Sequence, residues 1–126
     1  MTLRCVIVDD NRAVLSAASE LLEREGISVV GVAASGDEAL GLVERLEPEV
    51  VLIDIDLGPE SGFDLARRLA ALDGAGSRGI LISTHDEADF ADLIAASPAI
   101  GFLAKSDLSA SAIHRLLAQA HDERRY

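Results

Sequence analysis

The strongest constraint on the fold is a regular alternation of short apolar runs with longer stretches of helical periodicity. Runs such as VVLI and GILI are apolar at every position, which is typical of strands buried on both faces of a sheet. Apolar strands that alternate with helices predict parallel strands joined by crossover helices. We therefore expect an α/β fold with a doubly wound, five-stranded parallel sheet. The expected strands are residues 3–8, 27–33, 50–53, 80–83 and 100–104, and the expected helices are residues 12–25, 36–46, 61–72, 86–96 and 109–122.

Length and charge limit the classes of function. The chain has 126 residues and a formal net charge of −11, and we expect one domain over residues 1–126 without a second one. No apolar run approaches the roughly 18 residues that span a bilayer, and the N-terminus lacks the pattern of a secretory signal. We expect a cytoplasmic protein that does not bind membranes. An acidic surface is repelled by the phosphate backbone, so direct binding to DNA or RNA is not expected.

Polar residues that can carry chemistry stand at the ends of four expected strands. Asp9 and Asp10 follow the first strand, Asp54 follows the third, Ser83 ends the fourth and Lys105 follows the fifth. Ligands of doubly wound folds bind at the carboxyl ends of the strands, where these side chains would gather. Two carboxylates about 4 Å apart repel each other by roughly 4 kcal/mol at an effective dielectric near 20. Such a cluster therefore needs compensating cations.

A divalent cation and the lysine can supply this compensation. Mg²⁺ prefers oxygen ligands and usually takes one or two carboxylates from a protein, and Asp9 or Asp10 together with Asp54 fits Mg²⁺, or Mn²⁺ in its place. The free oxygen of Asp54 could then attack phosphorus and form an aspartyl phosphate. Lys105 would neutralise charge on the phosphoryl oxygens, and the Ser83 hydroxyl would donate a hydrogen bond to one of them.

These residues, in this order, resemble the receiver domain of bacterial two-component response regulators over essentially the whole chain. The acidic pair of that family matches Asp9 and Asp10, its phosphoacceptor matches Asp54, its Ser/Thr switch matches Ser83 and its lysine matches Lys105. The spacings agree, with 44 positions from Asp10 to Asp54 and 22 from Ser83 to Lys105. The resemblance implies a flavodoxin-like sheet with strand order 2-1-3-4-5. The stretch STHDEADF is similar to receivers that are often fused to helix-turn-helix DNA-binding domains.

The resemblance also implies roles for residues around the phosphoacceptor. The backbone carbonyl of Asp56 matches a metal ligand of the family, and its side chain occupies a variable position. Phe102 matches an aromatic residue that moves inward when the Ser/Thr hydroxyl approaches the phosphoryl group, and a core Phe that never moves is the alternative. Thr84 stands where the family tends to carry a small residue. Asp56, Thr84 and His85 are therefore expected modulators of phosphodonor access or phosphoryl lifetime, although a surface histidine without a role is an equal alternative for His85.

The chain departs from the family pattern in two loops. Gly58 stands where the family often has proline, and Pro59 follows one position later, so the loop geometry after the phosphoacceptor is left open. Ser106 replaces the proline that usually follows the lysine. Gly62, eight residues after Asp54, matches the glycine of the family.

The function that the resemblance implies is a stand-alone receiver, which we expect to lack an output domain. A histidine kinase or a histidine phosphotransfer protein would transfer a phosphoryl group to Asp54 in a Mg²⁺-dependent reaction. Phosphorylation would switch a partner-binding surface on the fourth helix, fifth strand and fifth helix. Such a chain is not an enzyme with a separate substrate, because it catalyses only its own phosphorylation and dephosphorylation. The downstream target, the kinase and phosphorylation-dependent dimerisation are left open by the sequence.

Two alternatives use the same residues differently. The first is a receiver-like interaction module that is never phosphorylated. The second is a phosphatase of the haloacid dehalogenase type, in which Asp54 is the nucleophile and Asp56 the general acid. Against the second, the DxD of that family ends the first strand, whereas here Asp9 and Asp10 precede it.

Overall fold

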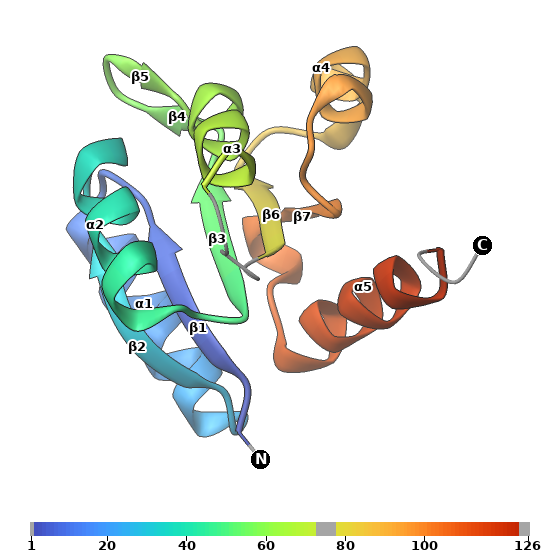
Figure 1. Cartoon of the computed structure of the whole chain (residues 1–126). Coiled ribbons are helices and arrows are strands. Elements are labelled where there is room, and N and C mark those ends of the chain that lie inside the picture. Colours follow the sequence, from blue (N-terminus) through green and yellow to red (C-terminus); the bar gives the residue numbers. More distant parts are fainter. Residues whose placement is uncertain (1, 73–77, 124–126) are drawn as a thin grey trace.

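The computed structural model describes residues 2–72 and 78–123, without the side chains of residues 121–123. Its main sheet has five parallel strands in the order β2-β1-β3-β6-β7 (Figure 1). The strands are β1 (Arg4–Val8), β2 (Ser28–Ala33), β3 (Val50–Asp54), β6 (Arg78–Ser83) and β7 (Gly101–Ala104). Counted within this sheet alone, the order is 2-1-3-4-5. The expected doubly wound, flavodoxin-like fold is therefore confirmed.

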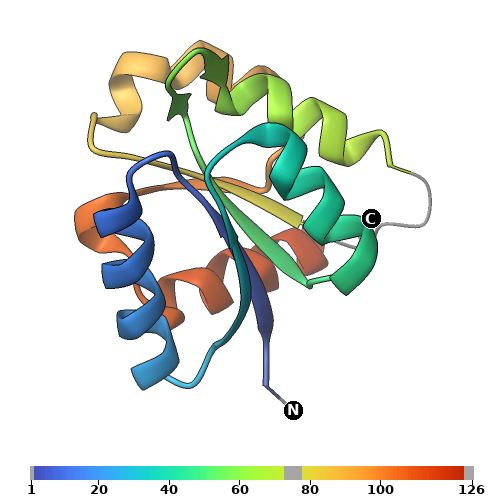
Figure 2. The ribbon, with the colours of Figure 1, turned by 90° about the vertical axis from the view of Figure 1, so that its left-hand side faces the viewer.

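Helices cover both faces of this sheet. They are α1 (Arg12–Arg24), α2 (Gly36–Leu46), α3 (Gly62–Ala70), α4 (Ala91–Ala96) and α5 (Ala110–Glu123). Figure 2 shows α1 and α5 together on one side of the sheet, and α2 and α3 on the other. Leu52 of β3 belongs to the core cluster on the α1 and α5 side, and its neighbours Val51 and Ile53 belong to the cluster on the α2 and α3 side. Both faces of the central strand are thus buried, which explains why its sequence is apolar without interruption.

The segment 86–96 differs from the single helix that the sequence predicts. It begins with a 3₁₀ turn, η1 (Glu87–Phe90), and continues as the short helix α4. Neither element has a buried residue, and the side chain of Asp86 makes no capping hydrogen bond. Because helices in proteins are stabilised mainly by packing of an apolar face, this weakly packed segment does not sustain one regular helix.

The loop after β3 contains a small hairpin that the sequence did not predict. Strand β4 (Asp56–Leu57) pairs antiparallel with β5 (Glu60–Ser61), and Gly58 and Pro59 connect them. Gly58 has a φ of 73°, and a proline fixes φ near −65°, which are the signs of a type II′ turn. The departures from the family pattern at these two positions therefore build a hairpin that runs directly into α3.

The other expected helices agree with the structure within three residues at each end. The third helix begins at Gly62, and Ser61 caps it by accepting a hydrogen bond from the N–H of Phe63. A second 3₁₀ turn, η2 (Lys105–Asp107), follows β7 directly. Among the described helices, none combines the length and the apolar character needed to cross a membrane.

Candidate functional site

The first acidic pair is split between the interior and the surface. Asp9 directly follows β1 and has no exposed surface, whereas Asp10 is exposed. The Oδ1 atom of Asp9 accepts a hydrogen bond of 2.9 Å from the N–H of Asn11, and its Oδ2 atom lies 2.7 Å from the Nζ of Lys105. Asn11 in turn caps α1 through its own side chain. The turn between β1 and α1 therefore fixes the Asp9 carboxylate at the sheet edge.

Asp54 is the last residue of the central strand and only 6% exposed. Its Oδ1 atom accepts a hydrogen bond of 3.2 Å from the N–H of Asp56, and its Oδ2 atom lies 3.2 Å from the Nζ of Lys105. A Cβ at Gly62 would stand 2.1 Å from the carbonyl oxygen of Asp54, closer than any real contact. A glycine at position 62 is therefore required for the chain to pass this close to Asp54.

The carboxylates of Asp9, Asp10 and Asp54 form a donor set for a cation. One oxygen from each lies within 4.8 Å of the others. Oxygen ligands with this spacing suit Mg²⁺ or Mn²⁺, which retain waters in their remaining positions. For Asp56 the structure records contacts of its N–H and its side chain, and metal ligation by its carbonyl stays a prediction.

The electrostatics also favour a bound cation. Burial raises the pKa of Asp54 to about 6, and the charge of Asp9 adds to this effect, while Lys105 and the N–H of Asp56 act in the opposite direction. Burial alone would lower the pKa of Lys105, but its contacts with Asp9 and Asp54 outweigh burial and raise it. One ammonium group thus faces more than one carboxylate, and the cluster keeps a negative charge that a divalent cation would neutralise.

Ser83 ends β6 beside this cluster and is 2% exposed. Its Oγ atom accepts a hydrogen bond of 2.9 Å from the N–H of His85. Since a hydroxyl both accepts and donates, the proton of Ser83 is still available for an oxygen in the cleft. Lys105 directly follows β7, and from the carboxyl end of that strand its Nζ reaches the carboxylates of Asp9 and Asp54.

Most of the residues predicted from the sequence line one open cleft of about 310 Å³. They are Asp9, Asp10, Asp54, Asp56, Ser83, Thr84, His85 and Lys105. Phe102 does not line this cleft, because it is half-buried and packs against the core on the α2 and α3 side. The sequence interpretation missed Asn11, Val14 and Gly58 as lining residues. An Asn before a helix is a capping signal and a Gly-Pro pair is a turn signal, and neither indicates by itself that the residue faces a site.

Comparisons with known proteins agree with this geometry. The family model of the response regulator receiver domain matches residues 5–117. The transcriptional regulatory protein YvfU of Bacillus subtilis is 33% identical over 104 residues, which are 82% of this chain and 52% of that protein. A transcriptional regulator of Pseudomonas aeruginosa is 30% identical over 104 residues, which are 82% of this chain and 50% of that protein. The chain thus spans about half the length of these curated relatives.

Solved structures show the same similarity. The signal receiver domain of the response regulator NarL from Mycobacterium tuberculosis has a TM-score of 0.79 at 26% identity, covering 91% of this chain and 96% of that chain. A LuxR-family two-component response regulator from Aurantimonas has a TM-score of 0.80 at 30% identity, covering 94% of this chain and 84% of that chain. With a family match over residues 5–117 and the expected fold, this chain belongs to the response regulator receiver domain family.

Proposed function

We propose that the chain is a phosphorylation-controlled switch in which Asp54 receives a phosphoryl group from the phosphohistidine of a kinase or phosphotransfer protein. The observation that carries this proposal is the convergence of the buried Asp9 and Asp54 carboxylates on the Nζ of Lys105, at distances of 2.7 and 3.2 Å. Family membership supports it, because a receiver domain implies a phosphodonor. The chain would change only its own phosphorylation state and would not be an enzyme with a separate substrate.

In this reaction a carboxylate oxygen of Asp54 attacks phosphorus and forms an O–P bond. The N–P bond of the donor breaks, and its electron pair leaves with the imidazole, which takes up a proton from solvent. Asp9, Asp10 and Asp54 would hold Mg²⁺, which supplies positive charge opposite the phosphoryl oxygens. Lys105 already lies against Asp54 and would exchange a carboxylate contact for a phosphoryl contact.

The switch would operate through the hydroxyl of Ser83. This hydroxyl would donate a hydrogen bond to a phosphoryl oxygen, and a hydrogen bond to a charged group contributes about 1.5 to 3 kcal/mol. A difference of this size between two conformations shifts their ratio roughly ten- to a hundredfold. Because β6 leads from Ser83 through Thr84 and His85 into η1, the shift would reach the segment 86–96 first. We propose that the output surface lies on α4, β7 and α5.

The rival functions have less support. An interaction module that is never phosphorylated does not need a buried carboxylate, a buried hydroxyl and a lysine around one cleft, and this chain has all three. A phosphatase would use Asp56 as a proton donor to a leaving group. The carboxylate of Asp56 instead accepts a hydrogen bond from the N–H of Gly58, at 3.2 Å.

The proposal is tested by incubating the protein with acetyl phosphate and Mg²⁺ and measuring its intact mass. We expect one phosphoryl adduct that requires Mg²⁺, is lost in Asp54→Asn and is retained in Asp56→Asn, the matched control on the same loop. No adduct in the wild type, with Mg²⁺ binding demonstrated and several donors tried, would contradict the proposal. Catalytic release of phosphate from a small ester that depends on Asp56 would favour the phosphatase instead.

A further inference from the structure

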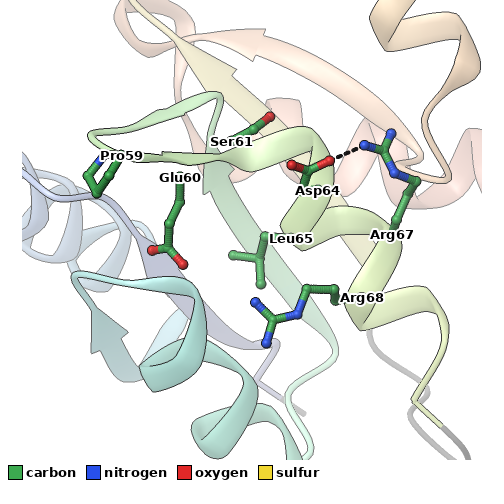
Figure 3. Close-up of a pocket in the computed structure, with 7 residues that line it drawn as sticks. All are labelled: Pro59, Glu60, Ser61, Asp64, Leu65, Arg67 and Arg68. Atoms are coloured by element: carbon green, nitrogen blue, oxygen red, sulfur yellow. Dashed lines mark hydrogen bonds and ion pairs between the residues drawn. The ribbon is translucent and has the colours of Figure 1, made fainter.

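A second groove, of about 720 Å³, is lined by residues of the β4–β5 hairpin and of α3 (Figure 3). Its polar side chains are not equivalent. Asp64 and Arg67 form an ion pair within α3, so they connect no separate elements. Glu60 of the hairpin and Arg68 of α3 extend instead toward the N-terminus of α2.

Glu60 supplies a long-range cap to α2. Its Oε2 atom accepts a hydrogen bond of 3.0 Å from the N–H of Gly36, the first residue of that helix. The first N–H groups of a helix have no partner within the helix, and a negative charge is favourable there. Ser35 satisfies a different donor, the N–H of Glu38. Arg68 adds an ion pair with Asp37 at 3.1 Å, so the hairpin and α3 are both tied to the start of α2.

This cap is connected to the phosphoacceptor by a short series of contacts. Glu60 pairs with Leu57 across the hairpin, and Ser61 pairs with Asp56. The N–H of Asp56 donates to the Oδ1 atom of Asp54. The capping bond at one end of the hairpin therefore restrains the backbone that contacts Asp54 at the other.

We propose that Glu60 is a positioning residue, which holds the β4–β5 hairpin against α2 and so sets the place of the Asp56 backbone and of Gly58 at the rim of the cleft. Asp56 and Gly58 both line the cleft. In the hydrogen bonds described, neither of these two residues contacts α2 directly. The consequence for phosphoryl transfer rests on the proposed function. The restraint on the hairpin does not.

Gly36 offers a way to disturb the cap without changing Glu60. A Cβ at this position would stand 2.8 Å from the Oε1 atom of Glu60, which is the far end of a flexible side chain and can move away. Gly36→Ala should therefore displace the carboxylate and leave the backbone of α2 intact. Gly41 is the matched control, because it lies in the same helix and a Cβ there would meet nothing within 4 Å.

The test is amide hydrogen exchange of residues 56–61 in protein without metal, followed by titration with Mg²⁺. Breaking one hydrogen bond to a charged group should raise hairpin exchange about tenfold in Glu60→Ala and Gly36→Ala. Loss of a group that orients metal-site residues should weaken Mg²⁺ binding by about tenfold. Glu60→Gln keeps an acceptor oxygen but loses the negative charge, so its exchange and its Mg²⁺ affinity should lie between those of wild type and Glu60→Ala. Gly41→Ala should remain within about twofold of wild type.

Three results would overturn the inference. They are unchanged hairpin exchange in Glu60→Ala, a Glu60→Gln variant that behaves like Glu60→Ala, and a rise in exchange that is as large in β1 as in the hairpin, which would mean only lower global stability. The proposed function fails separately: if wild type forms no phosphoryl adduct while hairpin exchange responds as described, the restraint stands without that role. An adduct formed equally fast, with unchanged exchange, in all variants would leave the proposed function intact and refute the role of Glu60.

Discussion

Two helices on the same side of the sheet, α3 and α4, are held in different ways. Buried residues of α3 are Gly62, Phe63, Leu65, Ala66 and Leu69, whereas neither α4 nor the preceding turn η1 has any. The N–H of Gly62 donates a hydrogen bond of 2.8 Å to the carbonyl of Ile55, so α3 begins directly against the residue that follows β3. Of the cleft-lining loops, the one after β3 therefore leads into a firmly packed helix and the one after β6 into a weakly packed one. Elements with few buried contacts open and shift at lower free energy, so a new charge at Asp54 should move α4 before α3.

Aromatic contacts link α3 to η1, the turn that precedes α4. The ring of His85, at the rim of the cleft, meets that of Phe90 edge-on with centroids 5.9 Å apart. Phe90 in turn lies 6.2 Å from Phe63 of α3. Phe90 thus contacts both α3 and His85, a residue that lines the cleft.

The largest effect is expected from a substitution at Gly62, where the start of α3 lies against the backbone of Asp54. Gly62→Ala places a Cβ where the backbone carbonyl of Asp54 stands, and backbone cannot move aside cheaply. We expect the free energy of unfolding to fall by at least about 3 kcal/mol, measured by urea denaturation. Gly41→Ala is the control and should be neutral or stabilising by up to about 1 kcal/mol, since that helix position is open. Equal free energies of unfolding for the two variants would show that the close approach of α3 to Asp54 does not require a glycine at position 62.

A matched pair of leucines compares the packing of the two helices. Leu65 of α3 is 2% exposed and Leu93 of α4 is 53% exposed. Leu65→Ala should lower the free energy of unfolding by about 2 to 5 kcal/mol. Leu93→Ala should change it by less than about 0.5 kcal/mol. A similar loss in both variants, by the same denaturation, would mean that α4 is packed as firmly as α3.

The pH dependence of Mg²⁺ binding tests the raised pKa of Asp54 in the cleft. Because the pKa of Asp54 is raised to about 6 without metal, a proton occupies the carboxylate below that pH and must leave before a cation binds. Mg²⁺ affinity measured by calorimetry should thus fall by up to about tenfold per pH unit below 6 and level off above it. The same shift means that any stability Asp54 gives the metal-free fold is present below pH 3.8 and lost as the pH rises through about 6. In Asp54→Asn, the change near pH 6 should disappear from the pH profile of Mg²⁺ affinity and from that of the metal-free stability. If the change persists, another group is responsible for the titration.

The smallest effect concerns the aromatic link. His85→Ala removes an edge-on ring contact worth about 0.5 to 1.5 kcal/mol in favourable cases, and less here because His85 is exposed. We expect a few-fold faster hydrogen exchange in η1 and α4 with unchanged exchange in α3. Asp89→Ala, an exposed substitution within η1, is the control. If both variants have the same exchange, the ring contact does not hold the segment.

Sequence reasoning succeeded where strong local patterns coincide with tertiary packing. The buried strand before Asp54 was predictable because both of its faces are apolar, and the gathering of Asp9, Ser83 and Lys105 followed from the rule that parallel strands end at one edge. Whether each of these residues performs its predicted role stays a prediction.

The features that the sequence did not predict depend on tertiary packing and on contacts between distant segments. The hairpin β4–β5 has two-residue strands, too short for any periodicity to signal. The bond between Glu60 and Gly36 joins residues 24 positions apart and has no local signature. The 3₁₀ start of the segment 86–96 reflects missing burial, although the acidic residues there suit a helix N-terminus.

The central claim is that phosphorylation of Asp54 is transmitted to α4 and not to α3. It is tested most directly by hydrogen exchange with mass spectrometry on protein incubated with Mg²⁺ and acetyl phosphate, compared with Mg²⁺ alone, for peptides covering 86–96 and 62–70. The account predicts altered exchange in the first peptide, little change in the second, and no change in Asp54→Asn. Unaltered exchange at 86–96 in a sample whose intact mass shows the adduct, or an equal change in both peptides, would contradict it.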